Sequence, residues 1–315
     1  MSASAQSSMT EKVQAYIAAR RQAGYALKIE AGQLTRFARF TDDSGYRGPL
    51  TVEITTRWAM ASRNRRRLTA ARRIEVLRSF ARYCQRFDPA TEIPPLQLFG
   101  PAHRRLTPHI YTGSEIQALL DAAGSLHPAD GLRPVTCTAL FGLIAATGLR
   151  VGEAVALKRT DVDLERRLLH IHYAKFGKAR WVALHCTTVC ALRQYIHRRD
   201  RDPLSRTVDA FFVFDRGHPV SAEQLEYAFR NLRQKLGWRA RGGHPHPRIH
   251  DLRHRFITCR LISWYQEGVD IDQRMLALST YVGHAHVTDT YWYVTATPQL
   301  MEIAAARFKG GRYEP

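Results

Sequence analysis

The chain has 315 residues, with 45% hydrophobic side chains and a formal net charge of +19. This length suits two domains that each bury a core, and the excess of Lys and Arg predicts a polyanionic partner, with nucleic acid as the leading class. The longest apolar run, residues 135–149, falls short of the roughly 20 residues that a membrane-spanning helix needs, so we expect no membrane partner.

The cysteines are odd in number and widely spaced, which favours free thiols in a reducing compartment over a disulfide framework. They are Cys84, Cys137, Cys186, Cys190 and Cys259. The first residues lack the basic and then apolar profile of a signal peptide. We therefore expect a cytoplasmic, nucleoid-associated protein of a bacterium.

Residues 1–9 are mostly small and polar, and we expect them to be disordered. Residues 10–90 predict a helical domain, whose expected helices cover residues 11–22, 28–41, 52–62 and 68–86. Its many basic side chains make it a candidate DNA-binding domain. The last of these helices carries an apolar stripe at Ala70, Ile74, Leu77, Ala81 and Cys84. Four short helices predict a small bundle.

Residues 91–108 are rich in proline and show little periodicity, which is typical of an extended linker. A second domain is expected over residues 109–315. Near its start, Thr112-Gly-Ser-Glu115 matches a capping box, in which the Thr112 hydroxyl and the Glu115 carboxylate each accept a hydrogen bond from a free backbone donor. This motif predicts a helix that begins directly after Thr112.

The apolar run of residues 135–149 predicts a buried core helix that ends beside Arg150. Residues 168–175 and 179–184 alternate in polarity on either side of Gly177, as the strands of a β-hairpin do. Helices are expected again from residue 187, including residues 250–267 and 270–281, which are followed by Gly268 and Gly283. The fold class that this order predicts is mainly α with a small β-sheet.

Three short motifs carry residues that can act on a phosphate. They are Thr147-Gly-Leu-Arg150-Val-Gly-Glu153, His250-Asp-Leu-Arg253, and Val282-Gly-His284, with Tyr293 nine positions after the last histidine. A phosphodiester under in-line attack gains negative charge on its non-bridging oxygens, so its catalyst needs several donors around one phosphorus. The spacing of three between His250 and Arg253 places both on one helix face.

These motifs resemble the boxes of the tyrosine recombinase, or phage integrase, family, and the likeness covers residues 109–300. The resemblance implies a SAM-like, four-helix core-binding domain followed by a catalytic domain. It also implies site-specific DNA integration, excision or transposition through a covalent 3′-phosphotyrosine, without metal, cofactor or ATP. Partners would be duplex recombination sites and a homo-tetramer, with related recombinases or accessory proteins as further partners. Residues 288–294 look more similar to integrases of transposable elements than to chromosome-dimer resolvases.

The resemblance also implies a role for each matching residue. Arg150 and Arg253 would clamp the scissile phosphate, His250 and His284 would assist by hydrogen bonding and proton transfer, and Tyr293 would be the nucleophile. Glu153 would orient the region around Arg150. The general acid that protonates the leaving 5′ oxygen falls on Lys175, with Lys178 as an alternative because Phe176 stands where the family usually has glycine.

Tyr291 offers a second phenol near the expected nucleophile. Residues two apart on a helix point to nearly opposite faces, so only one of Tyr291 and Tyr293 can enter a phosphate pocket. The spacing after His284 favours Tyr293, and we expect Tyr291 to be a packing residue.

We expect no metal site. His170 and His172 alternate on a strand, and Cys186 and Cys190 beside His185 lack a second ligand pair at zinc-site spacing. The two cysteines are instead expected to be buried on a helix. A metal nuclease that uses its histidines remains a rival interpretation, which EDTA would reveal.

Candidate DNA-binding residues form a dense basic run, to which the hairpin Lys178 is added. The run comprises Arg63, Arg65, Arg66, Arg67, Arg72 and Arg73, and its alternative interpretation is a solvated helix face.

Residues 300–308 are amphipathic and match the family's C-terminal exchange segment, which packs either on a neighbouring subunit or on its own. Two further interpretations apply to the whole chain. One is a type IB topoisomerase-like enzyme that nicks and reseals a single duplex, and the second is a non-catalytic DNA-binding protein of the same fold.

Overall fold

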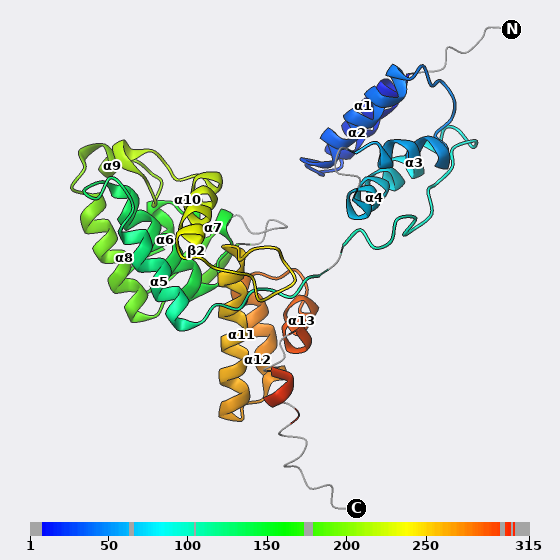
Figure 1. Ribbon diagram of the computed structural model, residues 1–315. Coiled ribbons are helices and arrows are strands. Elements are labelled where there is room, and N and C mark those ends of the chain that lie inside the picture. Colours follow the sequence, from blue (N-terminus) through cyan, green and yellow to red (C-terminus); the bar gives the residue numbers. More distant parts are fainter. Residues whose placement is uncertain are drawn as a thin grey trace, which may run out of the picture. The chain divides into compact units, whose positions relative to one another are not determined.

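The computed structural model describes residues 8–62, 66–103, 105–172, 179–296, 300–303 and 305. The chain forms two compact units, and the boundary falls between Arg105 and Leu106. Figure 1 shows the helices of the first unit in blue and cyan and those of the second from green to red. Each unit has its own hydrophobic core, so each is a domain in the physical sense.

The first unit contains the expected helices. They are α1 (Met9–Gln22), α2 (Glu30–Asp43), α3 (Val52–Met60) and α4 (Arg67–Cys84). All five residues of the apolar stripe on α4 are buried. Phe37, Trp58 and Phe80 pack in T-shaped, edge-to-face contacts in the core of this unit, with Phe37 contacting both other rings. The expected bundle is therefore confirmed, with ends that shift by a few residues.

The expectation of disorder up to residue 9 is wrong for its last two residues. Ser8 caps α1 through a capping box with Glu11, and Met9 is buried in the core of the first unit. The backbone N–H groups of Met9 and Thr10 also donate to the carboxylate of Asp42, near the end of α2. A polar stretch can therefore begin a helix when its side chains satisfy the free backbone donors.

Most of the expected linker, residues 91–108, belongs to the first unit instead of running free. The backbone N–H of Glu92 donates to the carbonyl of Leu50, and its carboxylate accepts from the N–H of Val52. Arg78 donates to the carbonyl of Pro94. Prolines remove donors but leave their carbonyls free to accept, and side chains of α4 use them.

The second unit begins with helices that surround a large core. In chain order its elements are α5 (Gly113–Gly124), α6 (Leu132–Thr147), α7 (Val151–Val155), η1 (Arg159–Asp161), β1 (Val162–Asp163), β2 (Leu168–Ile171), β3 (Arg180–Ala183), α8 (Cys186–Arg199), α9 (Pro203–Thr207), η2 (Asp215–Gly217), α10 (Ala222–Lys235), α11 (His250–Glu267), α12 (Ile271–Val282) and α13 (Thr288–Ala296). The capping box of Thr112 and Glu115 opens α5 as predicted. Helix α6 buries nine of its 16 residues and packs against both α5 and α8.

The described strands form one antiparallel sheet in the order β1-β2-β3. Leu169 pairs with Val182, and both side chains are buried, while His170 pairs with Trp181 on the other face. The next pair, Ile171 with Arg180, again points inward. The expected turn at Gly177 lies outside the described residues, but the mainly helical fold with a small sheet is confirmed.

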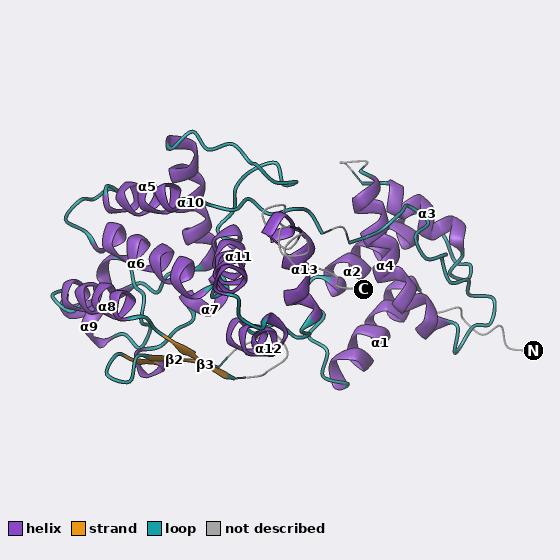
Figure 2. Cartoon of the chain, turned by 90° about the horizontal axis from the view of Figure 1, so that it is seen from below, coloured by secondary structure: helices purple, strands orange, loops and turns teal. Residues whose placement is uncertain are grey.

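Helices α11, α12 and α13 share a second, smaller cluster of buried side chains, which includes Ile257, Leu261, Leu278 and Tyr293. Figure 2 shows α12 beside the end of β3, and contacts between these elements link the smaller cluster to the sheet. Leu300, at the start of the expected exchange segment, is buried in this same cluster. The beginning of that segment therefore packs on its own unit.

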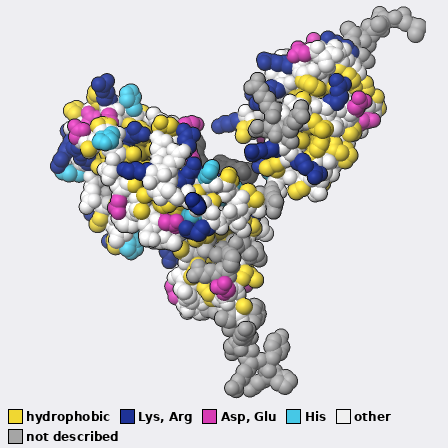
Figure 3. Space-filling model, viewed as in Figure 1, with side chains coloured by type: hydrophobic (Ala, Val, Ile, Leu, Met, Phe, Trp, Pro, Cys, Tyr) yellow, Lys and Arg dark blue, Asp and Glu magenta, His cyan; other side chains and the backbone are white. Residues whose placement is uncertain are grey.

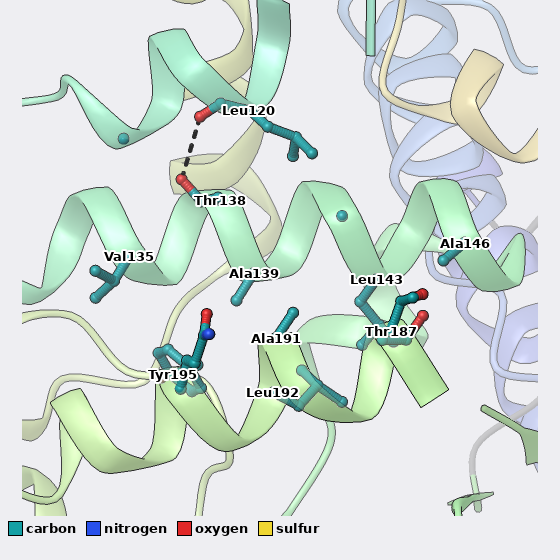
Figure 4. Close-up of a pocket in the computed structure, with 14 residues that line it drawn as sticks. Leu120, Val135, Thr138, Ala139, Leu143, Ala146, Thr187, Ala191, Leu192 and Tyr195 are labelled. Carbon is teal, nitrogen blue, oxygen red and sulfur yellow. Dashed lines mark hydrogen bonds between the residues drawn. The ribbon is translucent and has the colours of Figure 1, made fainter. Parts of the chain in front are cut away.

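An apolar groove of about 490 Å³ lies where α5, α6 and α8 meet. Figure 4 shows Ala139 of α6 and Ala191 of α8 pointing toward one another across it. Its lining holds no charged side chain, so it offers nothing to hold a phosphate. No helix among the described residues is long and apolar enough to cross a membrane.

Candidate active site

A buried ion-pair cluster forms where α7 meets β3. Glu153 is 6% exposed, and both of its carboxylate oxygens accept hydrogen bonds from Arg180, at 2.7 and 3.1 Å. Arg150 donates to the same carboxylate through Nη1, at 2.7 Å, and through its backbone N–H, at 3.1 Å. One carboxylate thereby fixes the orientation of two guanidinium groups.

Two glycines in the left-handed conformation hold the arginines of the site. Gly148, with φ +67°, follows the last residue of α6, and its carbonyl accepts from Nη1 of Arg253 at 2.7 Å. Gly283, with φ +72°, follows α12, and its carbonyl accepts from Nη2 of Arg150 at 2.6 Å. Helix ends leave carbonyls unpaired, and here the arginines pair with carbonyls at those ends.

Positive charge exceeds negative charge in this cluster, because three guanidinium groups accompany one carboxylate. Burial acts to raise the pKa of Glu153, but hydrogen bonds from Arg180 and Arg150 and the charges of both outweigh it, so this pKa lies below its ordinary value. Burial and the neighbouring Arg150 lower the pKa of Arg253 to about 10. Arg253 is 1% exposed, and its Nη2 has no hydrogen-bond partner among the described residues. The cluster therefore carries an excess of positive charge and a buried donor without an acceptor among the described residues.

His284 stands at the edge of the cluster with one nitrogen engaged. Its Nδ1 lies 2.6 Å from the hydroxyl of Thr290, which is fully buried. Burial, Arg253 and Arg150 lower the pKa of His284 to about 3, so its imidazole is neutral at physiological pH. The bond to Thr290 leaves Nε2 as the atom that can reach a ligand.

Tyr293 is 3% exposed and lies among the described residues of the smaller cluster. Its ring is parallel to that of His284, with the centroids 6.2 Å apart, and its phenol oxygen lies 2.7 Å from Nδ1 of His254. His254 directly follows Arg253 in α11. The structure thus brings the predicted nucleophile against the residue next to the arginine whose Nη2 has no hydrogen-bond partner among the described residues.

Tyr291 points away from this site. Its side chain is 38% exposed, and its hydroxyl donates to Asp272 on α12 at 2.7 Å. The expectation that Tyr291 is a packing residue is therefore wrong: it is a surface residue with a polar contact. The geometric expectation that the two phenols lie on different faces of one helix matches their positions in α13.

His250 is the first residue of α11 and is exposed. Its ring contacts that of His254, one turn later, with centroids 4.8 Å apart. Neighbouring protein atoms remove water from around the imidazole ring, and this desolvation lowers the pKa of His250 below its ordinary value. The positive charges of Arg253 and Arg248 lower this pKa further. His250 is thus a neutral imidazole at the entrance to the site, one helical turn from Arg253.

The predicted lysines of the hairpin, Lys175 and Lys178, lie outside the described residues, as do Arg63 and Arg65. In the first unit, Arg66 and Arg67 are exposed at the start of α4. Figure 3 shows Lys and Arg side chains on the visible surface of both units.

Arg72 and Arg73 are already engaged within the first unit. Arg72 is exposed but donates to the carbonyl of Ala102 at 3.2 Å. Arg73 donates to the carbonyl of Trp58 at 2.8 Å, and its guanidinium lies over the Trp58 ring. Arg73 therefore has a structural role in its observed position.

No group of three or more His, Cys, Asp or Glu side chains within the described ranges is placed to hold a metal ion. His172 pairs with Asp161, and His170 stacks on Trp181. The expectation that Cys186 and Cys190 are buried is wrong, because both are exposed. Helix α8 buries Val189 and Leu192 among other residues, and the two cysteines, four apart, share a different face.

Sequence reasoning missed two side chains of the site, Arg180 and His254. Arg180 occupies an inward position of β3, in alternation with the buried Val182, and a charged residue at such a position signals a buried ion pair. His254 follows His250 by four residues, which is the spacing of neighbours on a helix face. Both signals were present in the sequence.

A sequence model of the phage integrase family matches residues 110–299. Among curated proteins, the chain is 36% identical over 309 residues to "Putative integrase/recombinase y4rB" of Sinorhizobium fredii, covering 96% of this chain and 98% of that protein. It is 29% identical to "Tyrosine recombinase XerC" of Chlamydia trachomatis, covering 74% of this chain and 68% of the relative.

A solved structure with a similar fold is the Tn1549 transposon integrase, in complex with circular intermediate DNA. The TM-score is 0.68 at 18% identity, and the alignment covers 96% of this chain and 99% of that one. At this identity the likeness establishes a shared fold.

Proposed function

The chain belongs to the phage integrase family, and we propose that it is a site-specific DNA recombinase that cleaves and rejoins duplex DNA through a covalent 3′-phosphotyrosine. The reaction class is DNA strand transfer, in the service of integration, excision or transposition. The relatives named as recombinases or integrases support this reading, and the Tn1549 integrase was solved with DNA.

One observation carries the proposal: the buried guanidinium of Arg253 has one nitrogen without a hydrogen bond, and the buried Tyr293 contacts His254, the next residue along α11. Nη2 of Arg253 lacks a hydrogen bond among the described residues, and burying an unpaired charge is costly unless a ligand completes the site. A phosphodiester supplies one negative charge and oxygen acceptors in a geometry that arginine binds well. The excess of positive charge around Glu153 supports the same ligand.

Each residue of the site then has a distinct task. Arg150 and Arg253 bind the non-bridging oxygens and stabilise the charge that develops on them. His284 donates or accepts through Nε2, and His250 assists at the entrance. Tyr293 attacks phosphorus, and Glu153 holds Arg150 in place, so that the donors are in position before the reaction begins.

The leaving 5′ oxygen requires a proton, and we assign this to Lys175, with Lys178 as the alternative. A lysine near several arginines has a lowered pKa, which brings its proton closer to a useful range. Because one phosphoester replaces another, the bond energy is kept for rejoining, and neither ATP nor a metal ion is needed.

We further propose that the working form is a homo-tetramer on two duplexes, with residues 10–90 and 109–315 as core-binding and catalytic domains. The exposed Arg66 and Arg67 would contact the DNA backbone, together with Arg63, Arg65, Arg72 and Lys178. Phosphate contacts of this kind supply affinity and register. The rival activity, nicking and resealing of one duplex, would relax a supercoiled plasmid without exchanging strands between two.

The proposal is tested with nicked suicide duplexes whose sequence around the nick is randomised. Cleavage near the nick releases a short fragment that carries the 5′ hydroxyl, and this fragment diffuses away. Rejoining is then prevented, so the covalent intermediate accumulates and survives SDS. We expect an adduct with the wild-type chain and with Tyr291→Phe, in the presence of EDTA and without ATP, and none with Tyr293→Phe.

Two outcomes would contradict this account. If the wild-type chain formed no adduct on the pool, the proposed chemistry would be wrong. If Tyr293→Phe kept the adduct while Tyr291→Phe lost it, the assignment of the nucleophile would be wrong. Adducts recovered from the pool also identify the preferred DNA sequence.

A further inference from the structure

His254 contacts the atom that would attack DNA. Its Nδ1 lies 2.7 Å from the phenol oxygen of Tyr293, and the centroids of the two rings are 5.4 Å apart. His254 is one turn after His250 on α11, and Trp292 packs beside both His254 and Tyr293. A partly buried imidazole therefore faces the reacting oxygen from inside the protein.

The other two histidines of the site are placed differently. His284 lies face to face with the Tyr293 ring, and its Nδ1 is engaged by Thr290. His250 is exposed at the entrance. Among the three, His254 has the ring nitrogen that lies within hydrogen-bond distance of the phenol oxygen.

The protonation state of His254 fixes what this contact can do. Burial, followed by the charges of His250, Arg248, Arg253 and His244, lowers the pKa of His254 to about 2. The imidazole is thus neutral and has one nitrogen free to accept. Since a phenol is the stronger acid of the two neutral groups, Tyr293 donates and Nδ1 accepts.

We propose that His254 is a catalytic residue that accepts the phenol proton of Tyr293 during DNA cleavage and returns it during rejoining. This inference rests on the proposed function, because it concerns the same nucleophile. It assigns the base of the reaction to a residue outside the four boxed positions Arg150, His250, Arg253 and His284.

The step balances in both directions. In cleavage, the phenol oxygen forms a bond to phosphorus and passes its proton to Nδ1 of His254, while the bond from phosphorus to the 5′ oxygen breaks and that oxygen takes a proton from the lysine acid. In rejoining, the 5′ hydroxyl returns its proton to the lysine and attacks phosphorus. The phenol oxygen then leaves and recovers the proton from His254.

The cations around His254 also link proton transfer to DNA. Without DNA, burial and then the charges of Arg248 and Arg253 oppose a charged imidazole, so the phenol proton stays on Tyr293. A bound phosphodiester places a negative charge beside Arg253, which offsets this repulsion and makes His254 a better acceptor. The nucleophile would therefore be activated only when a phosphate occupies the site.

The test compares His254→Phe and His254→Asn with the wild-type chain in single-turnover cleavage of the suicide duplex recovered from the random pool. A general base typically contributes about 10²–10⁴-fold, so His254→Phe should slow adduct formation by about 10²-fold or more. His254→Asn keeps a polar atom near the Nδ1 position without a basic nitrogen and should be similarly slow. The matched control, His197→Phe, removes an exposed histidine of α8 and should react at the wild-type rate.

Two readouts separate proton transfer from a structural role. The rate of His254→Phe should rise about tenfold per pH unit near neutrality, because phenol deprotonation then depends on hydroxide, while the wild-type rate should vary much less. A duplex with sulfur in place of the bridging 5′ oxygen has a leaving group that needs no proton. It should rescue Lys175→Ala but not His254→Phe.

The inference is overturned if both His254 variants cleave within about threefold of the wild type, if the sulfur substrate rescues them, or if their pH profiles match the wild-type profile. Thermal unfolding and DNA affinity measured on the same variants identify any that fail to fold, and His254→Asn then provides the smaller perturbation. Absence of an adduct with the wild-type chain would instead refute the proposed function.

Discussion

Glu153 connects two arginines that come from different parts of the chain. It accepts from Arg180 on β3 and from Arg150, the residue that precedes α7, with a side chain that is almost fully buried. Removing one partner of a buried ion pair is more costly than removing a surface pair, because an uncompensated charge stays behind. Glu153 should therefore matter for stability as well as for the site.

Replacing Glu153 by Gln should lower the free energy of unfolding by about 3 kcal/mol at pH 7. The measurement is denaturant unfolding, with Glu165→Gln as the control. Glu165 pairs with Arg193 at an exposed position, so its loss should cost less than about 1 kcal/mol. Equal effects of the two substitutions would show that the buried pair does not stabilise the fold.

The loss of stability caused by Glu153→Gln should disappear at acidic pH. The folded-state pKa of Glu153 lies below its ordinary value, so its stabilising contribution is complete above the unfolded pKa of about 4.3 and is lost as the pH falls through the lower folded pKa. The difference between wild type and Glu153→Gln should thus be constant from pH 8 to about pH 5 and shrink below pH 4.

Individual residues were predictable from sequence where they sat in a motif with a chemical reason. Arg150, Arg253 and Tyr293 stand in ordered boxes, and the structure places Arg150 on the carbonyl of Gly283 and Tyr293 against His254, the residue after Arg253. The partners that hold them were not predictable, because every residue has a backbone carbonyl and the sequence does not indicate that the one of Gly148 accepts from Arg253. The contact between His254 and Tyr293 depends on how α13 packs against α11, which local spacing does not determine.

Helix ends, more than helix interiors, build this site. Gly148 ends α6 and Gly283 ends α12, each in a left-handed conformation and each with its carbonyl accepting a hydrogen bond from an arginine of the candidate site. A side chain at either glycine would clash, since a Cβ on Gly148 would come within 2.6 Å of the Phe256 ring and one on Gly283 within 2.6 Å of Arg180. Glycine at both positions permits the left-handed backbone conformation and avoids a clash with the neighbouring side chain.

Gly148→Ala should therefore destabilise the protein by about 2 kcal/mol, through the strained backbone and the contact with Phe256. It should also weaken DNA binding, because the shifted carbonyl no longer holds Arg253. Gly152→Ala is the control, since it lies within α7 with no heavy atom within 4 Å of the added Cβ. Thermal unfolding compares the two variants. Equal melting temperatures for Gly148→Ala and Gly152→Ala would contradict this view.

At the level of helices and strands, periodicity and caps were reliable guides. The capping box at Thr112 and the stripe on α4 predicted real elements. The proline-rich segment was harder to predict, because its hydrogen bonds run to distant partners such as Leu50 and Arg78. Proline content reports the lack of donors and says nothing about which side chains use the remaining carbonyls.

The two units have separate cores, which suggests that each can be studied alone. A fragment of residues 8–105 retains the described cluster around Phe37, Trp58 and Phe80 and should unfold cooperatively. It should also bind duplex DNA, with an affinity that falls steeply as salt rises. A fragment without a cooperative transition would show that its core depends on the rest of the chain.

Within this fragment, the start of α4 is the expected contact with DNA. Arginines there oppose the helix dipole, so Arg66 and Arg67 are better explained by binding an anion than by helix stability. The double variant Arg66→Ala/Arg67→Ala should reduce the slope of log affinity against log salt by up to about 2. The control, Arg82→Ala/Arg86→Ala, makes the same change in charge at exposed positions near the other end of α4. If it reduced the salt slope equally, the effect would come from net charge and not from a contact at the start of α4.

Attack on DNA by the phenol of Tyr293 is tested most directly by identifying the residue to which the DNA becomes covalently attached. The wild-type adduct from the suicide duplex is digested with protease and nuclease, and fragmentation mass spectrometry assigns the remaining nucleotide to one residue of the peptide that contains both Tyr291 and Tyr293. We predict a phosphodiester on the oxygen of Tyr293. A nucleotide on Tyr291, or on any residue other than Tyr293, would contradict the account.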